Sequence, residues 1–415
     1  MSSLVTIIKM KYFPYLSLRV LFNDRTIATF LLVLFCILFI PIERSGISTV
    51  KVAVMALCPL IFILKKPYIS KALLLGMGYW LVIYFLSLFK GEMRFSTLGF
   101  LAMYLMMFIT YYDFIIKGTF TLNYFQNILK SLIIAYGIIL ILQQCCLLVG
   151  IRNMPIINLQ NQFFLSITKL PSLTLEPSHS ARILTVAMLG YLRCEEISIS
   201  RKLTLREIFD SKHRRVIALF FWAMLTMGSG TAFVGIAILS LYFITRHTAI
   251  YVVPLLLGCF ILGQSMELQQ MKRVEILAKA SMTGNTKKMQ EEEGSGAVRI
   301  IPVLNLFTKT DLTKKETWIG QQSMKKDKAW WLKTDKSIID QYGLIAFLIS
   351  MLLVYSCMIH RFFSIETLFF LFFMGFSINN IYYSWGCLMV MTTIGWLQKQ
   401  KEQGILITEN EMKDE

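Results

Sequence analysis

Charged residues are scarce in this chain: they make up 16% of its 415 residues, whereas hydrophobic residues make up 56%. A soluble enzyme of this length needs a more charged surface, so the composition excludes an ordinary soluble protein of two or three domains. The mean hydropathy of +0.60 is typical of a chain that crosses a membrane several times. The composition therefore predicts an all-α polytopic membrane protein.

The sequence also lacks the motifs that mark nucleotide, nucleic-acid and metal sites. It holds no Walker loop, no Rossmann glycine fingerprint and no aromatic-basic pattern. No pair among its eight cysteines has metal-ligand spacing, so we interpret them as small core residues. We therefore expect no metal, no cofactor and no nucleic-acid partner. Basic cytoplasmic segments and anionic lipid account for much of the net charge of +17.

Apolar runs predict about 12 membrane-spanning helices (10–12). For each of the pairs 216–245 and 362–396 the alternative is a tight hairpin or a re-entrant element. The whole chain, 1–415, is predicted to form a single integral membrane domain. The runs fall near residues 26–42, 49–64, 72–89, 97–116, 131–150, 179–193, 216–228, 231–245, 249–264, 341–358, 362–377 and 380–396.

The distribution of basic residues predicts the orientation. With the N-terminus inside, the cytoplasmic segments collect 21 Lys and Arg, whereas the short outer loops and their flanks hold 7. Cytoplasmic loops of membrane proteins carry such an excess, so both termini are predicted to be cytoplasmic. A long outer loop, roughly 265–340, is predicted between two of the spans.

The stretch Leu173–Arg182 concentrates polar groups where a span begins. One interpretation is a plain helix start, in which Pro occupies the first turn, Ser178 is the cap and Glu176 lies near the positive end of the helix dipole. The functional interpretation rests on His179, the one histidine of four predicted to face out, and on Arg182, which follows it on the same helical face. A membrane-embedded arginine needs a partner, and an anionic lipid head group would serve.

A tight glycine turn, Gly228–Thr231, joins two short spans at the outer face. It is either a simple turn between helices or an anion site, in which Ser229, Thr231 and nearby backbone N–H groups approach a phosphate.

Two further outer segments carry candidate ligand-binding residues. In Gly294–Arg299 a cation lies between flexible glycines and the apolar run Ile300–Leu304. Arg299 is therefore either a solvated side chain or a phosphate contact held at the membrane surface. Asp340 and Tyr342 open the tenth span, where they are either helix caps or polar groups that hold a sugar. The expected glycan-binding residues are Ser178, Asp340 and Tyr342.

The pattern of these motifs resembles the Wzy-type O-antigen and capsular polysaccharide polymerases. The motifs are the outward Glu-Pro-Ser stretch, the Ser-Gly-Thr turn, the arginine of the long loop and the Tyr-Gly pair at residues 342–343. The resemblance covers the layout from about Leu173 to Phe347. It implies a metal-independent glycosyltransferase of the bacterial cytoplasmic (inner) membrane, which transfers a growing glycan from undecaprenyl diphosphate onto a lipid-linked repeat unit at the outer face.

The resemblance also implies roles for particular residues. Arg182 and Arg299 look like the family's diphosphate-holding arginines, and Glu176 or His179 is the candidate base for the acceptor hydroxyl. The expected partners are undecaprenyl-diphosphate-linked oligosaccharides and membrane lipids, together with a chain-length regulator and a flippase.

Two alternatives remain open. One is a lipid-linked oligosaccharide flippase, although the spans before the sixth are nearly free of charge and offer few cations for a transport cavity. The other is an O-antigen ligase, although ligases usually show a histidine late in the long loop. Here no histidine occurs between His247 and His360.

Overall fold

The computed structural model describes residues 23–41, 43, 47–91, 93–159, 169–244, 254, 258, 261, 294–321, 337–378 and 380–405. All regular structure in these residues is helical, apart from one isolated bridge between Met154 and Leu159. This confirms the predicted all-α class.

A helix occupies every predicted apolar run except 249–264, which lies almost wholly outside the described residues. The helices at these runs are α3 (Asp24–Cys36), α4 (Thr49–Leu64), α5 (Lys71–Phe89), α6 (Phe95–Ile116), α7 (Leu122–Leu148), α8 (Pro177–Ile199), α10 (Ser211–Thr226), α11 (Gly230–Ser240), α17 (Gly343–Cys357), α18 (Ile365–Met374) and α19 (Tyr382–Glu402). Shorter elements are η1 (Pro155–Ile157), α9 (Leu205–Ile208), η2 (Leu241–Phe243), α15 (Gly294–Thr308), α16 (Lys315–Ile319) and η4 (Ile338–Asp340).

Serine caps determine where several of these helices begin. Ser48 and Ser70 each accept a backbone N–H of the first turn at 3.2 Å, at the starts of α4 and α5. Ser364 does the same for α18 at 3.3 Å. Each cap satisfies a donor that the first turn of a helix leaves without a partner.

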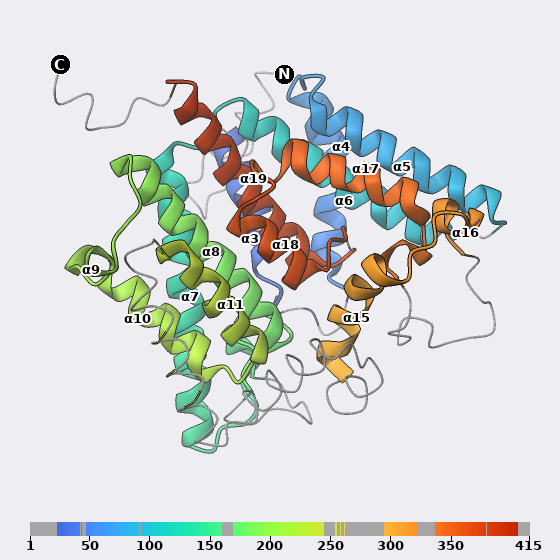
Figure 1. Ribbon diagram of the computed structural model, residues 1–415. Helices are drawn as coiled ribbons and strands as arrows, with labels where there is room; N and C mark the ends of the chain where they lie inside the picture. The colour runs from blue at the N-terminus through green and yellow to red at the C-terminus, as the bar shows by residue number, and fades with distance from the viewer. Residues whose placement is uncertain are drawn as a thin grey trace, which may run out of the picture.

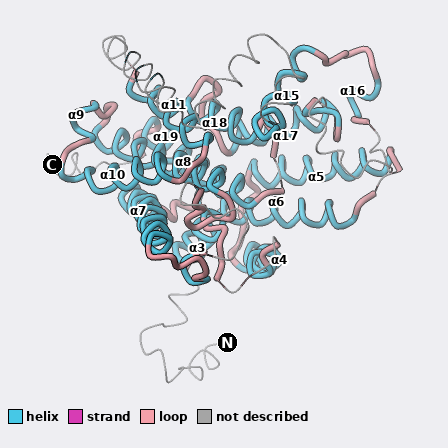
Figure 2. Tube along the Cα trace, turned by 90° about the horizontal axis from the view of Figure 1, so that it is seen from below, coloured by secondary structure: helices cyan, strands magenta, loops and turns pink. Residues whose placement is uncertain are grey.

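Two helices, α8 and α19, form the centre of the molecule. Residues 180–192 of α8 and 383–394 of α19 are buried without interruption, so both helices are enclosed on every side. Figures 1 and 2 show them between α7, α10 and α11 on one side and α4, α5, α6 and α17 on the other. Because protein surrounds them, these two helices can carry polar residues that a lipid-facing helix could not.

The outer helices have the opposite character. Among the described residues three helices, α5, α6 and α7, are long and apolar enough to cross a membrane, and α5 and α7 leave most of that length exposed or only partly buried. On α5 the side chains of Leu74, Met77, Leu81, Phe85 and Leu88 are 42% to 62% exposed and follow helical spacing, so they form one continuous apolar stripe on the outside. A soluble protein rarely exposes such a stripe. The exposed apolar surface therefore supports a membrane protein.

The helices alternate in direction, so their ends gather at two opposite ends of the molecule. Lys65, after α4, pairs with Asp24 at the start of α3 at 2.7 Å. In contrast, Lys51 at the start of α4 donates to the Ile37 carbonyl after α3 at 2.6 Å. We call the first end the basic end. The residues whose contacts lie at the basic end are Asp24, Lys65, Lys117, Thr119, Glu195, Lys212 and Lys401. The residues whose contacts lie at the opposite end are Ile37, Lys51, Leu170, Ser172, Arg182, Met227 and Tyr383. 

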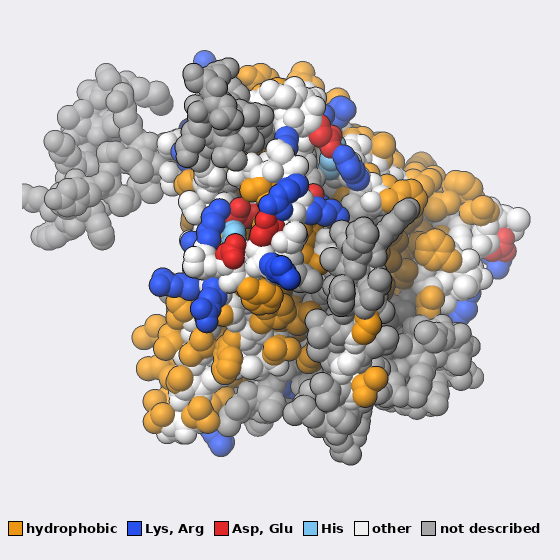
Figure 3. Space-filling view, turned by 60° about the vertical axis from the view of Figure 1, so that its left-hand side comes forward, with side chains coloured by type: hydrophobic (Ala, Val, Ile, Leu, Met, Phe, Trp, Pro, Cys, Tyr) orange, Lys and Arg blue, Asp and Glu red, His pale blue; other side chains and the backbone are white. Residues whose placement is uncertain are grey.

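One face of the molecule shows the boundary between apolar and charged surface. In Figure 3 basic and acidic side chains gather in a band above a hydrophobic area. The exposed hydrophobic residues of α10 include Trp222 and Leu225, at 49% and 56% exposure. Lys212 at the start of the same helix instead pairs with Glu195 of α8 at 2.8 Å. A charged end and an apolar flank on one helix suit the boundary between water and lipid.

Part of the predicted long loop is folded. Within 265–340 the structure describes 294–321 and 337–340, which contain α15, α16 and η4. Helix α15 packs against η4 and α18, and α16 packs against α17. The glycines before Arg299 are helical from Gly294 onward, so the predicted flexibility of this stretch is wrong there. Burial of Ile301 and Asn305 on one side of α15 explains why the helix forms.

Candidate functional site

The loop that precedes α8 is held rigidly by buried hydrogen bonds. Asn158 Nδ2 donates to the carbonyls of Ser172 and Thr174, each at 2.6 Å. Gln143 of α7 accepts from Ser172 N at 3.0 Å, and the Leu173 carbonyl accepts from the backbone that follows α3. Three separate segments therefore fix the position at which α8 begins.

Glu176, Ser178 and His179 form the first turn of α8 and its cap position. The N-cap is Glu176, whose side chain is 63% exposed, so the interpretation of Ser178 as the cap is wrong: α8 begins at Pro177, and Ser178 is already in the first turn. Ser178 Oγ donates to Glu176 Oε2 at 3.2 Å, and His179 Nε2 lies 3.8 Å from the same oxygen. This turn thus brings the carboxylate, the hydroxyl and the imidazole together at the opposite end of the molecule.

Arg182 lies one turn deeper and is 3% exposed. Its NH1 group donates to the hydroxyl of Tyr383, in the first turn of α19, and its guanidinium carbon lies 4.6 Å from the centre of the Tyr383 ring. The Arg182 Nε atom is buried and bonds to no described residue. The predicted need for a partner is thus met within the protein, by a tyrosine, and one N–H donor remains for a further acceptor.

Tyr383 is the residue that the sequence did not reveal. Its ring also stacks on His179, with centroids 4.4 Å apart and an interplanar angle of 28°. It therefore holds both the imidazole and the guanidinium of α8 in place. One available signal was its position, since the predicted span 380–396 begins at the same outer face as the span of His179.

The turn Gly228–Thr231 lies near the same place. Gly228 adopts a φ of +72°, which reverses the chain between α10 and α11. The preceding Met227 carbonyl accepts from Leu170 N at 3.4 Å, in the loop before α8. Ser229 is buried as the N-cap of α11, and Thr231 is in its first turn. Helix α11 packs on α8, so both predicted phosphate-binding residues share one end of the molecule with Arg182.

Lys51 is a second buried cation at this end. It is 0% exposed, and its Nζ lies 4.7 Å from the ring centre of Tyr382, the neighbour of Tyr383. Glu43 lies in the preceding loop and accepts from Val50 N at 2.7 Å. Partial burial acts to raise the pKa of Glu43, but hydrogen bonds from Ser48, Val50 and Thr49 and the charge of Lys51 outweigh it, so the pKa is lowered.

Asp340 and Tyr342 lie elsewhere, beside α5, α16 and α17 on the right of Figure 1. Asp340 Oδ2 accepts from Ser337 N at 2.5 Å in a capping box, and its carbonyl accepts from Gln321 N at 2.7 Å. Tyr342 lies under Lys90, whose Nζ is 5.6 Å from the ring centre. These contacts are structural, and the structure does not bring the two residues to the α8 site.

Arg299 is in α15, and its side chain lies outside the described residues. Its pairing with Arg182 on one diphosphate therefore stays a prediction. Among the residues searched, no group of three or more His, Cys, Asp or Glu could hold a metal ion.

The arrangement at the α8 site can accept a proton and hold an anion. Glu176 supplies an exposed carboxylate, while Arg182 supplies a fixed, desolvated guanidinium about one helical turn away. Charge-assisted hydrogen bonds in such a water-poor place are stronger than in solution. Comparison of the chain with protein-family models, with curated proteins and with solved structures finds no match.

Proposed function

We propose that this protein is a polysaccharide polymerase of the bacterial cytoplasmic membrane. It transfers a growing glycan from undecaprenyl diphosphate onto a lipid-linked repeat unit at the outer face. In this proposal the chain crosses the membrane about 12 times, the basic end faces the cytoplasm, and the end with Glu176 and Arg182 faces out.

One observation carries the proposal. Opposite the basic end, an arginine that is 3% exposed, with one buried donor bonded to no described residue, lies beside a carboxylate–imidazole pair. Transfer from a lipid diphosphate needs an anion holder and a base within reach of one another. The first turns of α8 contain candidates for both.

The proposed reaction uses these residues in turn. The acceptor hydroxyl attacks the anomeric carbon of the donor sugar, a new C–O bond forms, and the bond between that carbon and the diphosphate oxygen breaks. The hydroxyl proton passes to Glu176, which is the more exposed of the two candidate bases. The diphosphate leaves as an anion, and Arg182 stabilises its charge. Tyr383 positions the Arg182 guanidinium, and His179, which stacks on Tyr383, positions the Glu176 carboxylate.

A gel of surface polysaccharide from cells that lack the protein tests the reaction class. We expect single repeat units on their normal anchor, because export and attachment continue while polymerisation stops. Lipid-linked repeats trapped on the cytoplasmic side would instead identify a flippase, and full-length chains that fail to reach their anchor would identify a ligase.

Complementation of these cells tests the residues. We expect Arg182→Ala and Arg299→Ala to abolish long chains, and Arg182→Lys to restore them poorly because a point charge does not replace the planar fork. Arg152→Ala removes an exposed arginine at the same end and serves as the control. Normal chain length in Arg182→Ala, with the protein inserted normally, would refute the anion-holding role.

A further inference from the structure

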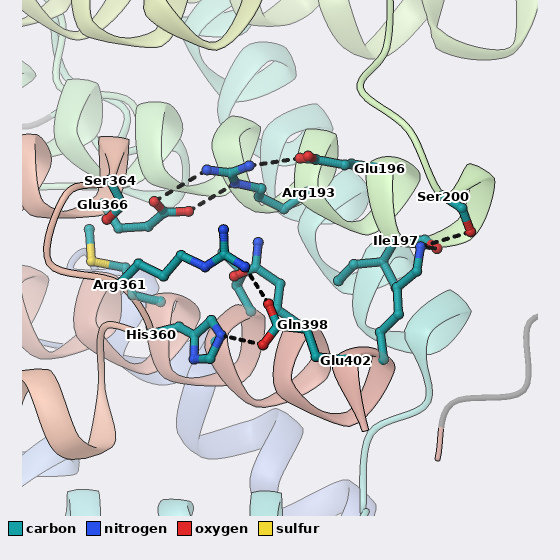
Figure 4. Close-up of a pocket in the computed structure, with 14 residues that line it drawn as sticks. Arg193, Glu196, Ile197, Ser200, His360, Arg361, Ser364, Glu366, Gln398 and Glu402 are labelled. Atoms are coloured by element: carbon teal, nitrogen blue, oxygen red, sulfur yellow. Dashed lines mark hydrogen bonds and ion pairs between the residues drawn. The ribbon is translucent and has the colours of Figure 1, made fainter. Parts of the chain in front are cut away.

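A polar pocket opens at the basic end, far from the α8 site. It has a volume of about 210 Å³ and lies between the last turns of α8, the segment before α18 and the last turns of α19. Figure 4 shows charged side chains from all three segments pointing into it. The part of its lining formed by Met391, Ile394 and Gly395 is largely apolar. The proposed glycan transfer uses none of these residues.

The carboxylates of this pocket are already bonded. Glu366 and Glu196 both pair with Arg193, at 2.9 Å and 2.7 Å. The two oxygens of Glu402 accept from His360 and Arg361, at 3.0 Å and 2.5 Å. The acidic side chains therefore have little capacity left to bind a cation.

Hydrogen-bond donors, in contrast, remain open. Arg361 is 71% exposed, and only its NH2 group bonds to a described side chain, so Nε and NH1 are available. The amide of Gln398 lines the pocket and bonds to no other described residue. An acceptor-rich, anionic group satisfies these donors best, and a guanidinium suits phosphate oxygens in particular.

The net charge narrows the choice of anion. The lining holds Arg193, Arg361 and Lys401 against Glu196, Glu366 and Glu402, so the formal charges cancel when His360 is neutral. A neutral site favours a singly charged phosphodiester over a doubly charged phosphate monoester.

The residues that follow Arg361 point to a lipid as the source of the phosphodiester. Phe362 and Phe363 lie in the chain between the lining residues Arg361 and Ser364, and they are 55% and 95% exposed. Phe rings this exposed are stabilised when apolar groups, such as acyl chains, cover them. In the proposed orientation this end faces the cytoplasm, where the membrane leaflet is rich in anionic head groups.

We propose that this pocket binds the head group of an anionic phospholipid, with the phosphodiester on Arg361 and Gln398 and the acyl region against Phe362 and Phe363. The lipid would join the ends of α8, α18 and α19. The site is independent of the proposed glycan transfer.

Native mass spectrometry of the purified full-length protein, titrated with phosphatidylglycerol or phosphatidylcholine, tests this site. We expect phosphatidylglycerol to bind more tightly. Arg361→Gln and Gln398→Leu should each weaken it about tenfold, which corresponds to about 1.4 kcal/mol. Both side chains are outside the buried core, so these variants should fold. The control is Lys399→Gln, which removes one exposed charge from α19, the helix of Gln398. Lys399 does not line the pocket, so this variant should bind phosphatidylglycerol as the unmodified protein does.

Three results would overturn the proposal. Equal affinity for the two lipids would remove the role of charge. An equal loss in Lys399→Gln would reduce the effect to general surface charge. Displacement of phosphatidylglycerol by millimolar inorganic phosphate would assign the pocket to a soluble phosphate and not to a lipid.

Discussion

Tyr383 should be the most informative single position in the outer site, because it bonds Arg182 in two separable ways. Its hydroxyl accepts a charge-assisted hydrogen bond, and its ring lies 4.6 Å from the guanidinium carbon. Tyr383→Phe removes the first contact and keeps the second, whereas Tyr383→Leu removes both.

The expected costs follow from the burial of the pair. Arg182 and Tyr383 are 3% and 6% exposed, so water cannot replace the lost hydroxyl. A hydrogen bond to a charged group contributes about 1.5–3 kcal/mol, and a desolvated cation–π contact contributes about 2 kcal/mol. We therefore expect Tyr383→Phe to lower the free energy of unfolding by about 2 kcal/mol, and Tyr383→Leu by about 4 kcal/mol.

Equilibrium unfolding in mixed micelles with rising dodecyl sulfate measures these costs, and a double-mutant cycle assigns them. In an Arg182→Met background the charge is gone, so Tyr383→Phe should cost less than about 0.5 kcal/mol. Tyr84→Phe on α5 is the control, since its hydroxyl bonds to no described residue. In the complementation assay Tyr383→Phe should shorten the polysaccharide, and Tyr383→Leu should shorten it further.

Additivity would refute this reasoning. If Tyr383→Phe costs the same with Arg182 and with Met at that position, the hydroxyl does not stabilise the guanidinium. Tyr383 would then be an ordinary core aromatic residue.

Two further predictions concern packing and pH. In Gly386→Ala a new Cβ would lie 2.6 Å from the Phe35 carbonyl oxygen, so α19 and α3 must separate, and the free energy of unfolding should fall by about 1–3 kcal/mol. The control Gly99→Ala, in open space on α6, should be neutral or stabilising. Equal free energies of unfolding in the two variants would contradict this prediction. Hydrogen bonds from Arg201 and Thr204 lower the pKa of the Glu207 carboxyl from 4.5 to about 2. The ionised carboxylate therefore stabilises the folded loop fully above pH 4.5, and this stabilisation is lost as the pH falls from 4.5 through about 2. Hydrogen exchange of residues 204–210 should therefore be slower than in Glu207→Gln at pH 5, and this difference should shrink as pH falls from 4.5 and vanish only below pH 2. A constant difference would show that this ion pair does not control the loop.

The sequence by itself determined the helical elements and their alternating arrangement. Apolar runs of sufficient length can satisfy their backbone only as helices in an apolar environment, and the helices match the runs wherever the structure describes them. Lys65, Lys212 and Lys401 lie at one end because successive helices run in opposite directions.

The sequence also indicated that Arg182 needs a partner, since an unpaired guanidinium is costly at that depth. Local pattern could not identify that partner. Tyr383 is 201 residues away along the chain, and the contact exists only because α8 and α19 pack together at their first turns. A span-opening tyrosine looks the same in the sequence whether it faces lipid or a buried cation.

Tertiary packing decided the remaining features. It placed Asp340 and Tyr342 away from α8. The Asp340 carbonyl accepts from Gln321 N, and the Lys90 ammonium donates to the carbonyl of Gln341, so this segment is held beside α16 and α17. It also enclosed α8 and α19 on all sides, which makes a polar helix tolerable in the interior. The pocket at the basic end joins three segments that are distant in sequence, so its geometry follows from how the helix ends meet and not from any one motif.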